Sequence, residues 1–333
     1  MNEMIILQHG SGGEATDKLI NNIIFKHLRN DILAEKHDGA FLDISGKLAF
    51  STDSYVVSPI FFAGGNIGEL AVYGTVNDLA MCGAEARYLS LSFIIEEGLP
   101  IADFEKILVS IGAAAERAGV QVVTGDTKVV ERGKGDKIYI NTSGIGTINP
   151  RSDIGIRNIK NGDVILINAP IASHGMAIMS QREGLRFESD IVSDTQNLNF
   201  TVQEIIEKFG DKIHFLRDAT RGGLASILLE IVSSSRFGIQ VSEEKIPVDN
   251  PVRNACEMLG LDPLYVANEG VFACIADKEI ADGVLSILKA KNKSASPIGT
   301  VTTEHAGKVI AVNPFGGRHA VHPFIGEQLP RIC

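Results

Sequence analysis

The sequence predicts an α/β protein built from two domains. Apolar runs of strand length alternate with segments of helical periodicity, as where a helix over residues 104–115 leads through Gly119 into a strand at 120–124. A length of 333 residues is typical of two domains, and a chain that is 44% hydrophobic and 22% charged can bury a large core. Residues 149–152 (Asn-Pro-Arg-Ser) carry turn signals. We therefore expect one domain over 1–150, a second over 151–313, and a flexible tail over 314–333.

Charge and cysteine content exclude several classes of partner. The net charge of -10 argues against nucleic acid or an anionic membrane, because binding to phosphate surfaces requires a basic face. No apolar run approaches the roughly 18 residues of a membrane span, and the first residues lack the basic and apolar regions of a signal peptide. Four cysteines without paired spacing fit a reducing compartment. We expect a cytoplasmic protein whose partners are proteins and small molecules.

Two polar residues interrupt the first apolar helix. A strand at 47–52 is followed directly by Asp53, and the glycine-rich loop 64–68 opens a helix that Gly83 ends. Asn77 and Asp78 are poor helix-interior residues within this apolar segment. Polar groups there need partners, so they mark either a solvated helix edge or a metal or phosphate site.

A second carboxylate motif follows the strand at 120–124. The glycine turn Gly125, Asp126, Thr127, Lys128 places a carboxylate, a hydroxyl and an ammonium together at a strand end. Asp53, Asp78 and Asp126 share the chemistry of hard oxygen ligands for Mg²⁺ on nucleotide phosphates. Spacing alone does not bring them together, and three separate aspartates would have ordinary structural roles.

Residues 9–13 (His-Gly-Ser-Gly-Gly) form a glycine-rich stretch near the start of the chain. They lack the spacing of a P-loop or a Rossmann motif, which leaves a flexible arm or a phosphate-binding lid as the two interpretations.

The second half offers two candidate acid–base residues. His174 lies at a turn between a strand at 163–168 and a helix, where a histidine either caps and packs or acts chemically. Glu269 precedes a strand at 271–276 and is either an ordinary edge carboxylate or part of a site. Neither residue is distinguished by its spacing alone.

The sequence ends on a cysteine, Cys333. Only a few per cent of a thiol with a pKa near ~8.5 is thiolate at neutral pH, so a folded site must complete its activation. The extended segment from Gly316 to Cys333 would span on the order of 55 Å, enough to reach such a site. The alternatives are simple disorder of the last residues and a disulfide, which the spacing of the other cysteines does not favour.

These motifs together resemble one family along nearly the whole chain. The matching segments are residues 9–13 (His-Gly-Ser-Gly-Gly), 52–56 (Thr-Asp-Ser-Tyr-Val), 74–80 (Gly-Thr-Val-Asn-Asp-Leu-Ala), 123–128 (Val-Thr-Gly-Asp-Thr-Lys), 218–223 (Asp-Ala-Thr-Arg-Gly-Gly), 266–270 (Val-Ala-Asn-Glu-Gly) and 330–333 (Pro-Arg-Ile-Cys). The internal motifs resemble the superfamily of aminoimidazole ribonucleotide synthetase, selenophosphate synthetase and thiamine monophosphate kinase. The ending is similar to that of the hydrogenase maturation HypE family. Selenophosphate synthetases differ, since they carry a reactive cysteine or selenocysteine near the amino terminus and this chain has no cysteine before Cys82.

The resemblance implies a fold, an activity and partners. The fold is the two-domain aminoimidazole-ribonucleotide-synthetase-like fold, with mixed sheets flanked by helices and a homodimer formed by the ATP-binding amino-terminal domain. The activity is ATP-dependent dehydration of an S-carboxamide on Cys333 to an S-cyanide. HypF would supply the carbamoyl group, and a HypC and HypD complex would accept the cyanide for the iron of NiFe hydrogenase.

The resemblance also implies roles for individual residues. Mg²⁺ would be held by Asp53, Asp78 and Asp126. The ATP phosphates would be bound by Asn77, Asp78, Thr127 and Lys128. Glu269 would be the base, with His174 behind it and Cys333 as the carrier. Two other functions stay open: a superfamily kinase acting on a free small molecule, and a non-catalytic scaffold tethered to partners by its tail.

Overall fold

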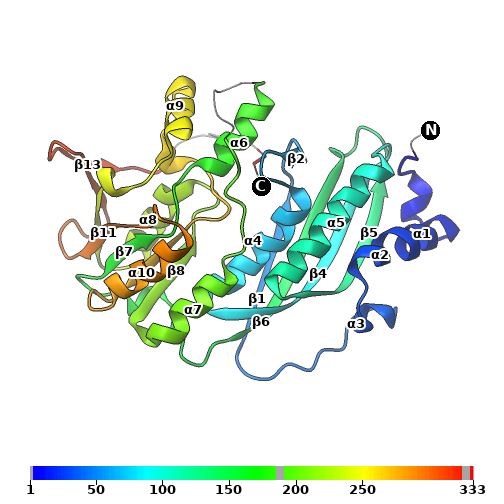
Figure 1. Ribbon diagram of the computed structural model, residues 1–333, viewed down its shortest axis with the longest axis horizontal. Coiled ribbons are helices and arrows are strands. Elements are labelled where there is room, and N and C mark those ends of the chain that lie inside the picture. The colour runs from blue at the N-terminus through cyan, green and yellow to red at the C-terminus, as the bar shows by residue number, and fades with distance from the viewer. Residues whose placement is uncertain (1–2, 185–190, 325–330, 333) are drawn as a thin grey trace.

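The chain folds around two β-sheets that lie side by side, each with helices packed on it (Figure 1). The structure, a computed structural model, describes residues 3–184, 191–324 and 331–332. Apolar side chains form one core under the first sheet and further cores on the second. In the part of the chain described, no helix is long and apolar enough to cross a membrane. The expected α/β class with mixed sheets flanked by helices is confirmed.

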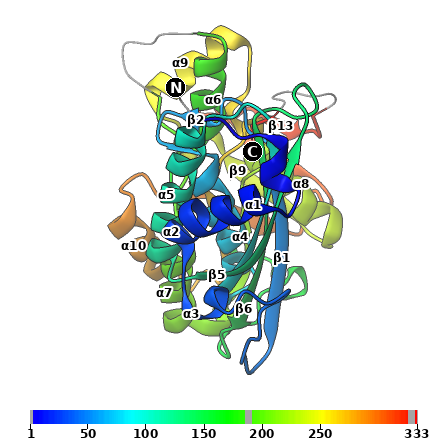
Figure 2. The same cartoon turned by 90° about the vertical axis from the view of Figure 1, so that its right-hand side faces the viewer.

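The first sheet has four strands in the order β1-β6-β4-β5, and only β4 and β5 run parallel. The strands are β1 (Leu48–Tyr55), β4 (Ala84–Glu96), β5 (Gln121–Val130) and β6 (Ile138–Ile148); β2 (Phe61–Phe62) and β3 (Gly65–Asn66) form a separate hairpin. The helices are α1 (Glu14–Leu19), α2 (Phe25–Leu28), α3 (Asp31–Ala34), α4 (Ile67–Met81) and α5 (Ile101–Ala118). Figure 2 shows α1 and α2 beside the β5 side of this sheet.

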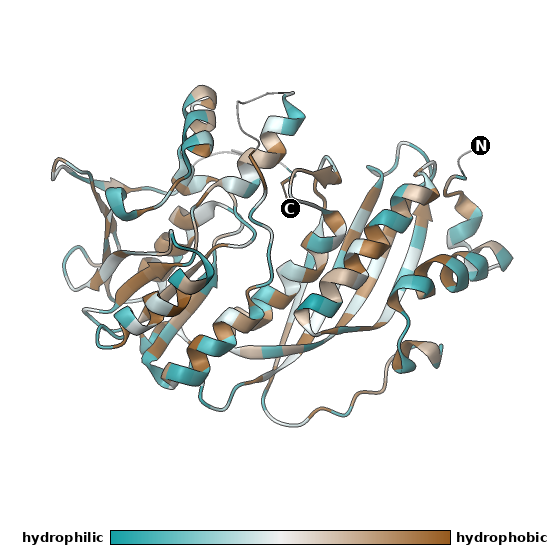
Figure 3. Cartoon of the chain, in the orientation of Figure 1, coloured by the Kyte–Doolittle hydropathy of each residue, from teal (hydrophilic) through white to brown (hydrophobic). Residues whose placement is uncertain are grey.

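Local sequence explains the two long helices. Helix α5 begins after Pro100 and ends at Gly119, whose φ of 70° is the left-handed conformation that glycine adopts readily. Its buried apolar residues recur at helical spacing and form one stripe that packs inward. Figure 3 shows hydrophobic and hydrophilic bands alternating along this helix. Helix α4 starts where the Asn66 side chain accepts a hydrogen bond from the Gly68 N–H at 2.8 Å. It is buried on nearly all sides, because it packs between the first sheet and elements α7 and β8 of the second half.

The second sheet has seven strands in the order β13-β12-β9-β11-β7-β10-β8, and only β12 and β9 pair in parallel. The strands are β7 (Val164–Ile167), β8 (Ile213–Asp218), β9 (Gly238–Ser242), β10 (Phe272–Ala276), β11 (Ser296–Thr302), β12 (Val309–Val312) and β13 (Arg318–Val321). The helices are α6 (Ser173–Arg182), α7 (Asn199–Phe209), α8 (Gly223–Ser234), α9 (Asn250–Leu259) and α10 (Ala281–Lys291).

Three expectations from the sequence are wrong. Asp53 does not follow a strand but lies within β1, and the expected turn at Gly125 lies inside β5. Residues 318–321 of the expected flexible tail form β13, whose main chain pairs with β12. Ile332 is also fixed, because its side chain is only 3% exposed and packs in the core of the first sheet. Residues 325–330 and Cys333 lie outside the described residues.

Candidate active site

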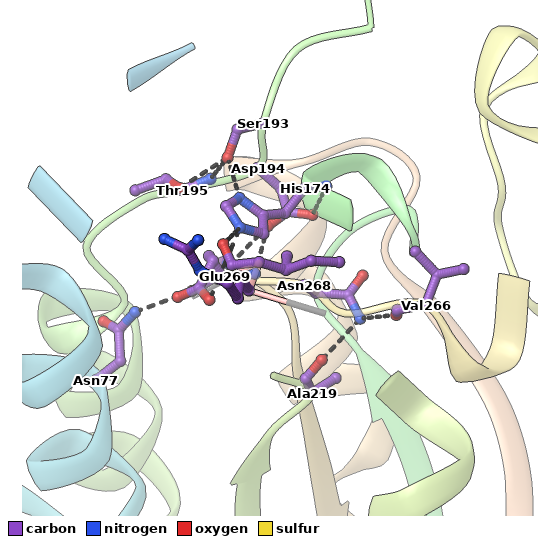
Figure 4. A network of polar contacts seen from close by, with 12 residues as sticks. Asn77, His174, Ser193, Asp194, Thr195, Ala219, Val266, Asn268 and Glu269 are labelled. Atoms are coloured by element: carbon purple, nitrogen blue, oxygen red, sulfur yellow. Dashed lines mark hydrogen bonds and ion pairs between the residues drawn. The ribbon is translucent and has the colours of Figure 1, made fainter. Parts of the chain in front are cut away.

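His174 and Glu269 meet at the junction of the two halves, held by one carboxylate. His174 is the second residue of α6, and Glu269 lies in the loop before β10. The Oδ2 atom of Asp194 accepts from the His174 backbone N–H at 3.1 Å, and Oδ1 accepts from the N–H groups of Glu269 at 2.6 Å and Gly270 at 2.9 Å (Figure 4). Asp194 therefore fixes the relative position of two segments almost a hundred residues apart.

The imidazole of His174 is fully buried and bonded at both nitrogens. Its Nε2 lies 2.9 Å from the carbonyl oxygen of Ile332, and its Nδ1 lies 2.8 Å from Oγ of Ser193. A carbonyl only accepts, so Nε2 carries the proton and Nδ1 accepts from the serine hydroxyl. Burial lowers the pKa of His174, which favours this neutral ring.

Glu269 is buried beside this ring, and one of its carboxyl oxygens can still accept a hydrogen bond. The residue is 4% exposed, and its Oε1 lies 4.0 Å from Nε2 of His174. Among the described residues, no group donates a hydrogen bond to that oxygen. Burial, reinforced by the charges of Asp194 and Asp218, raises the pKa of Glu269 well above its ordinary value. A buried carboxyl oxygen without a partner is suited to bind a polar ligand group.

The described end of the tail lies against this pair. Ile332 bonds His174 through its carbonyl, and the Arg331 carbonyl accepts from Nη2 of Arg182 at 2.8 Å. The backbone N–H of Ser58 also donates to the Arg331 carbonyl, at 3.3 Å. Cys333 itself lies outside the described residues, but its peptide bond starts at the Ile332 carbonyl that His174 holds. The fold thus brings the residue before the thiol to Glu269.

A group of carboxylates lies nearby, between β1, α4 and β8. Oγ of Ser51 donates to Oδ2 of Asp78 at 2.6 Å. Burial raises the pKa of Asp78, and the Ser51 hydrogen bond opposes that rise. Burial also raises the pKa of Asp218 to about 7, with a further contribution from the charge of Asp78 and a smaller one from Asp53. These carboxylates are close enough to influence one another's ionisation.

A separate cavity of about 660 Å³ lies at the β5 edge of the first sheet, opposite the β1 edge, between β5 and the amino-terminal helices. Asp126, Thr127, Lys128 and Gly10 contribute to its lining. The glycine-rich stretch 9–13 reaches β5 here, since a Cβ on Gly10 would lie 2.5 Å from the backbone nitrogen of Val129. An ammonium, a hydroxyl and a close-packed glycine segment fit a nucleotide phosphate group.

Within a single chain Asp53, Asp78 and Asp126 do not come together, so the prediction that they share one metal site stays a prediction for a site formed by two copies of the chain. Asp53 lies on β1 and Asp126 on β5, the two opposite edges of the sheet. Three strand spacings separate them, roughly 14 Å. Among the described residues, no group of three His, Cys, Asp or Glu could hold a metal ion. Asp53 and Asp78 do lie together, so the separation concerns Asp126 alone.

The prediction that Asn77 binds phosphate is contradicted by its contacts. Its side chain is 0% exposed. Its amide donates to the carbonyls of Gln196 at 3.0 Å and Glu269 at 3.3 Å, and its oxygen accepts from the Leu198 N–H at 2.8 Å. Asn77 joins α4 to the second half of the chain, which accounts for a polar residue inside an apolar helix.

Known proteins match this chain over its full length. Two family models match it: "AIR synthase related protein, N-terminal domain" over residues 36–148 and "AIR synthase related protein, C-terminal domain" over residues 160–312. The carbamoyl dehydratase HypE of Rhizobium leguminosarum bv. viciae is 48% identical across 100% of this chain and 96% of its own length. The chain belongs to the carbamoyl dehydratase HypE family.

Solved structures of HypE proteins share the fold. A crystal structure of the hydrogenase maturation protein HypE in complex with ATP is 47% identical and superposes with a TM-score of 0.95, covering 98% of this chain and 99% of that one. A HypE chain from a crystal structure of a HypE-HypF complex is 43% identical with a TM-score of 0.81, covering 91% of this chain and 99% of that one.

In this HypE family member, sequence reasoning missed two residues of the site. Asp194 positions both His174 and Glu269, yet no periodicity marks it, since its contacts lie 20 and 75 positions away. Asp218 was noted only as part of a glycine-rich motif, and its neighbours Asp53 and Asp78 come from the other half of the chain. A search for polar clusters such as Ser193, Asp194 and Thr195 between helices would have drawn attention to the first.

Proposed function

We propose that the chain is an ATP-dependent carbamoyl dehydratase that converts an S-carboxamide on Cys333 into an S-cyanide. One observation carries the assignment: the main chain just before Cys333 is held by His174 beside a buried carboxyl, Glu269, whose Oε1 has no partner among the described residues. Membership of a family whose relatives are named carbamoyl dehydratase supports the same activity.

The reaction removes one water from the carboxamide. The carbon–oxygen bond breaks, both nitrogen protons leave, and a carbon–nitrogen triple bond forms on the sulfur-bound carbon. Oxygen is a poor leaving group in an amide, so ATP supplies the phosphoryl group that makes it a good one, and ADP and phosphate are released. The chain must therefore hold ATP, hold the tail, and accept protons.

Glu269 is the proposed base. A carboxyl whose pKa is raised is a stronger base once ionised than an ordinary glutamate. Its unpartnered Oε1 is free to accept an N–H of the carboxamide. His174 is better suited to positioning, because its Nε2 proton is engaged by Ile332 and its Nδ1 by Ser193. This revises the expectation that His174 stands behind Glu269 as a second base.

For ATP we propose the cavity at β5. Lys128 and Thr127 offer the cation and hydroxyl that phosphates require. Binding of ATP in this family is supported by the solved HypE complex with ATP. Asp53, Asp78 and Asp126 are the proposed carboxylate ligands of Mg²⁺, which would neutralise phosphate charge. Asn77 is not part of this proposal.

The separation of Asp53 from Asp126 favours a nucleotide site shared by two copies of the chain. Strand β1 is an edge strand, with Leu48 42% and Phe50 70% exposed. An exposed apolar edge is suited to pairing with another chain. We therefore propose a homodimer formed by the amino-terminal domain, residues 1–150, in which the Asp53 edge of one copy meets the Lys128 region of the other.

Two partners complete the proposed pathway. A relative has been solved as a HypE-HypF complex, which supports HypF as the carbamoyl donor for this chain. We further propose that a HypC and HypD complex accepts the cyanide, as the family resemblance implies. Intact-mass measurement of the C-terminal peptide tests the assignment, because dehydration of a carbamoylated Cys333 removes one water and a kinase acting elsewhere would leave this peptide unchanged.

A further inference from the structure

The last described residues are held mainly through their main chain. The Arg331 carbonyl accepts from Arg182 at 2.8 Å and from the Ser58 N–H at 3.3 Å, and the Ile332 carbonyl binds His174. Main-chain contacts of this kind would accept almost any sequence. Selection of this particular tail must therefore come from side chains, and Ile332 supplies one part by filling a site in the first core.

The Arg331 side chain also contributes to the selection of this tail sequence. Its docked position is unfavourable in two respects. Its guanidinium lies near that of Arg182, whose pKa is lowered first by burial and then by the charge of Arg331. Arg331 also has a φ of 55°, a left-handed backbone conformation that costs free energy for any residue other than glycine. Docking thus places a second cation and an unfavourable backbone at one residue, and other contacts must stabilise both.

Asp136 is the carboxylate that pairs with Arg331. It lies in the loop that joins β5 to β6, and its Oδ2 contacts Nη2 of Arg331 directly. The same guanidinium group donates to the carbonyl of Val56 at 3.4 Å. The Arg331 and Asp136 side chains are 43% and 34% exposed, so the pair is partly withdrawn from solvent. Charge-assisted bonds in that setting are stronger than those of fully exposed pairs.

We propose that Asp136 is a positioning residue that recognises Arg331 and thereby seats Ile332 and its carbonyl at His174. Docking of the tail is then specific for arginine followed by isoleucine and depends on the charge of Asp136. Only the expected effect of docking on the dehydration rate rests on the proposed dehydratase function. The docking itself is independent of any chemistry at Cys333.

The docked state is measured without turnover from the δ1-methyl NMR signal of Ile332 in full-length protein labelled at isoleucine methyls. Asp136→Asn should lower the ratio of docked to undocked tail about three- to tenfold, because it leaves Arg331 unpaired beside Arg182. The Asp136→Asn change should have little further effect in an Arg331→Gln background, since the two side chains act through each other. Asp136→Glu should restore most of the docking. The matched control is Asp153→Asn, which breaks an exposed aspartate–arginine pair in the second half and should leave the signal unchanged.

An Ile332 signal that stays at its docked position in Asp136→Asn would overturn the proposal. So would full additivity of the Asp136 and Arg331 changes, because that would make Asp136 a structural residue unrelated to the tail. Dehydration is then measured in a separate arm, where the rate should fall in proportion to the docked population. If the wild-type protein does not dehydrate its tail, the proposed function fails, while the NMR outcome still decides the role of Asp136.

Discussion

The Nε2 atom of His174 lies 2.9 Å from the carbonyl oxygen of Ile332, which joins the fully buried ring of α6 to the end of the chain. Release of the tail would leave a buried N–H without its acceptor, at a cost of about 1–3 kcal/mol. The Ile332 carbonyl selects the tautomer with a proton on Nε2, and the Ser193 hydroxyl completes the bonding of the ring at Nδ1. The contact therefore favours the tail position in which the Ile332 carbonyl is held beside the Glu269 site.

Glu269→Gln should abolish dehydration and leave tail docking and ATP binding intact. Glutamine has the same shape but cannot accept a proton, so the expected loss of rate is about 100-fold or more. The wild-type rate should rise with pH, because the pKa of Glu269 is raised and the base form appears only as the pH approaches that value. Single-turnover mass spectrometry of the carbamoylated protein measures the rate. A variant with near wild-type turnover would exclude Glu269 as the base.

Asp218→Asn should stabilise the fold in a pH-dependent way. The pKa of Asp218 is about 7 in the folded chain and near 3.9 when unfolded, so its contribution to stability is present below about pH 4 and lost as the pH rises to 7. Asparagine does not titrate. The advantage of the variant should therefore grow between about pH 4 and 7, to on the order of 4 kcal/mol, and then level off. Urea unfolding at several pH values measures it, and a difference independent of pH would be inconsistent with a protonated Asp218.

Mixing two inactive variants tests the shared nucleotide site. Asp53→Asn and Lys128→Ala should each abolish ATP-dependent dehydration alone. After subunit exchange, half of the dimers are mixed and each has one intact site, so activity should recover to about a quarter of the wild-type value. A site contained in one chain would give no recovery. Native mass spectrometry of the mixture, which resolves the mixed dimer from the two homodimers by mass, confirms that exchange has taken place.

The sequence determines some of these features locally and others only through the fold. Helix α5 was predictable, because its apolar spacing and its end at Gly119 are properties of adjacent residues. The sequence predicts a turn at Gly125, because glycine within a strand and glycine in a turn cannot be distinguished without knowledge of the neighbouring strands. A Cβ there would lie 2.1 Å from the Leu91 carbonyl, so close strand packing is the reason for the glycine.

The residues of the candidate site can be predicted from the sequence in part, but their arrangement depends on the fold. The family resemblance indicates Glu269 and His174, but their 4.0 Å approach depends on Asp194, which lies in a connecting segment that has no periodic signal. Asn77 looked like a ligand because sequence cannot tell which polar helix residue faces another part of the chain. Asp126 shares a chemistry with Asp53, but only the sheet order reveals that the two lie on opposite edges.

The measurement that tests the central claim most directly is the mass of the C-terminal peptide during turnover. The protein is mixed with its carbamoyltransferase, carbamoyl phosphate and ATP. Cys333 should gain one carbamoyl group and then lose one water, and Cys333→Ala should show neither change while still binding ATP, because the proposed phosphate ligands lie on the folded body. A wild-type peptide that gains no adduct would contradict the dehydratase function. ATP consumption with an added small molecule would then indicate a kinase, and no consumption would indicate a scaffold.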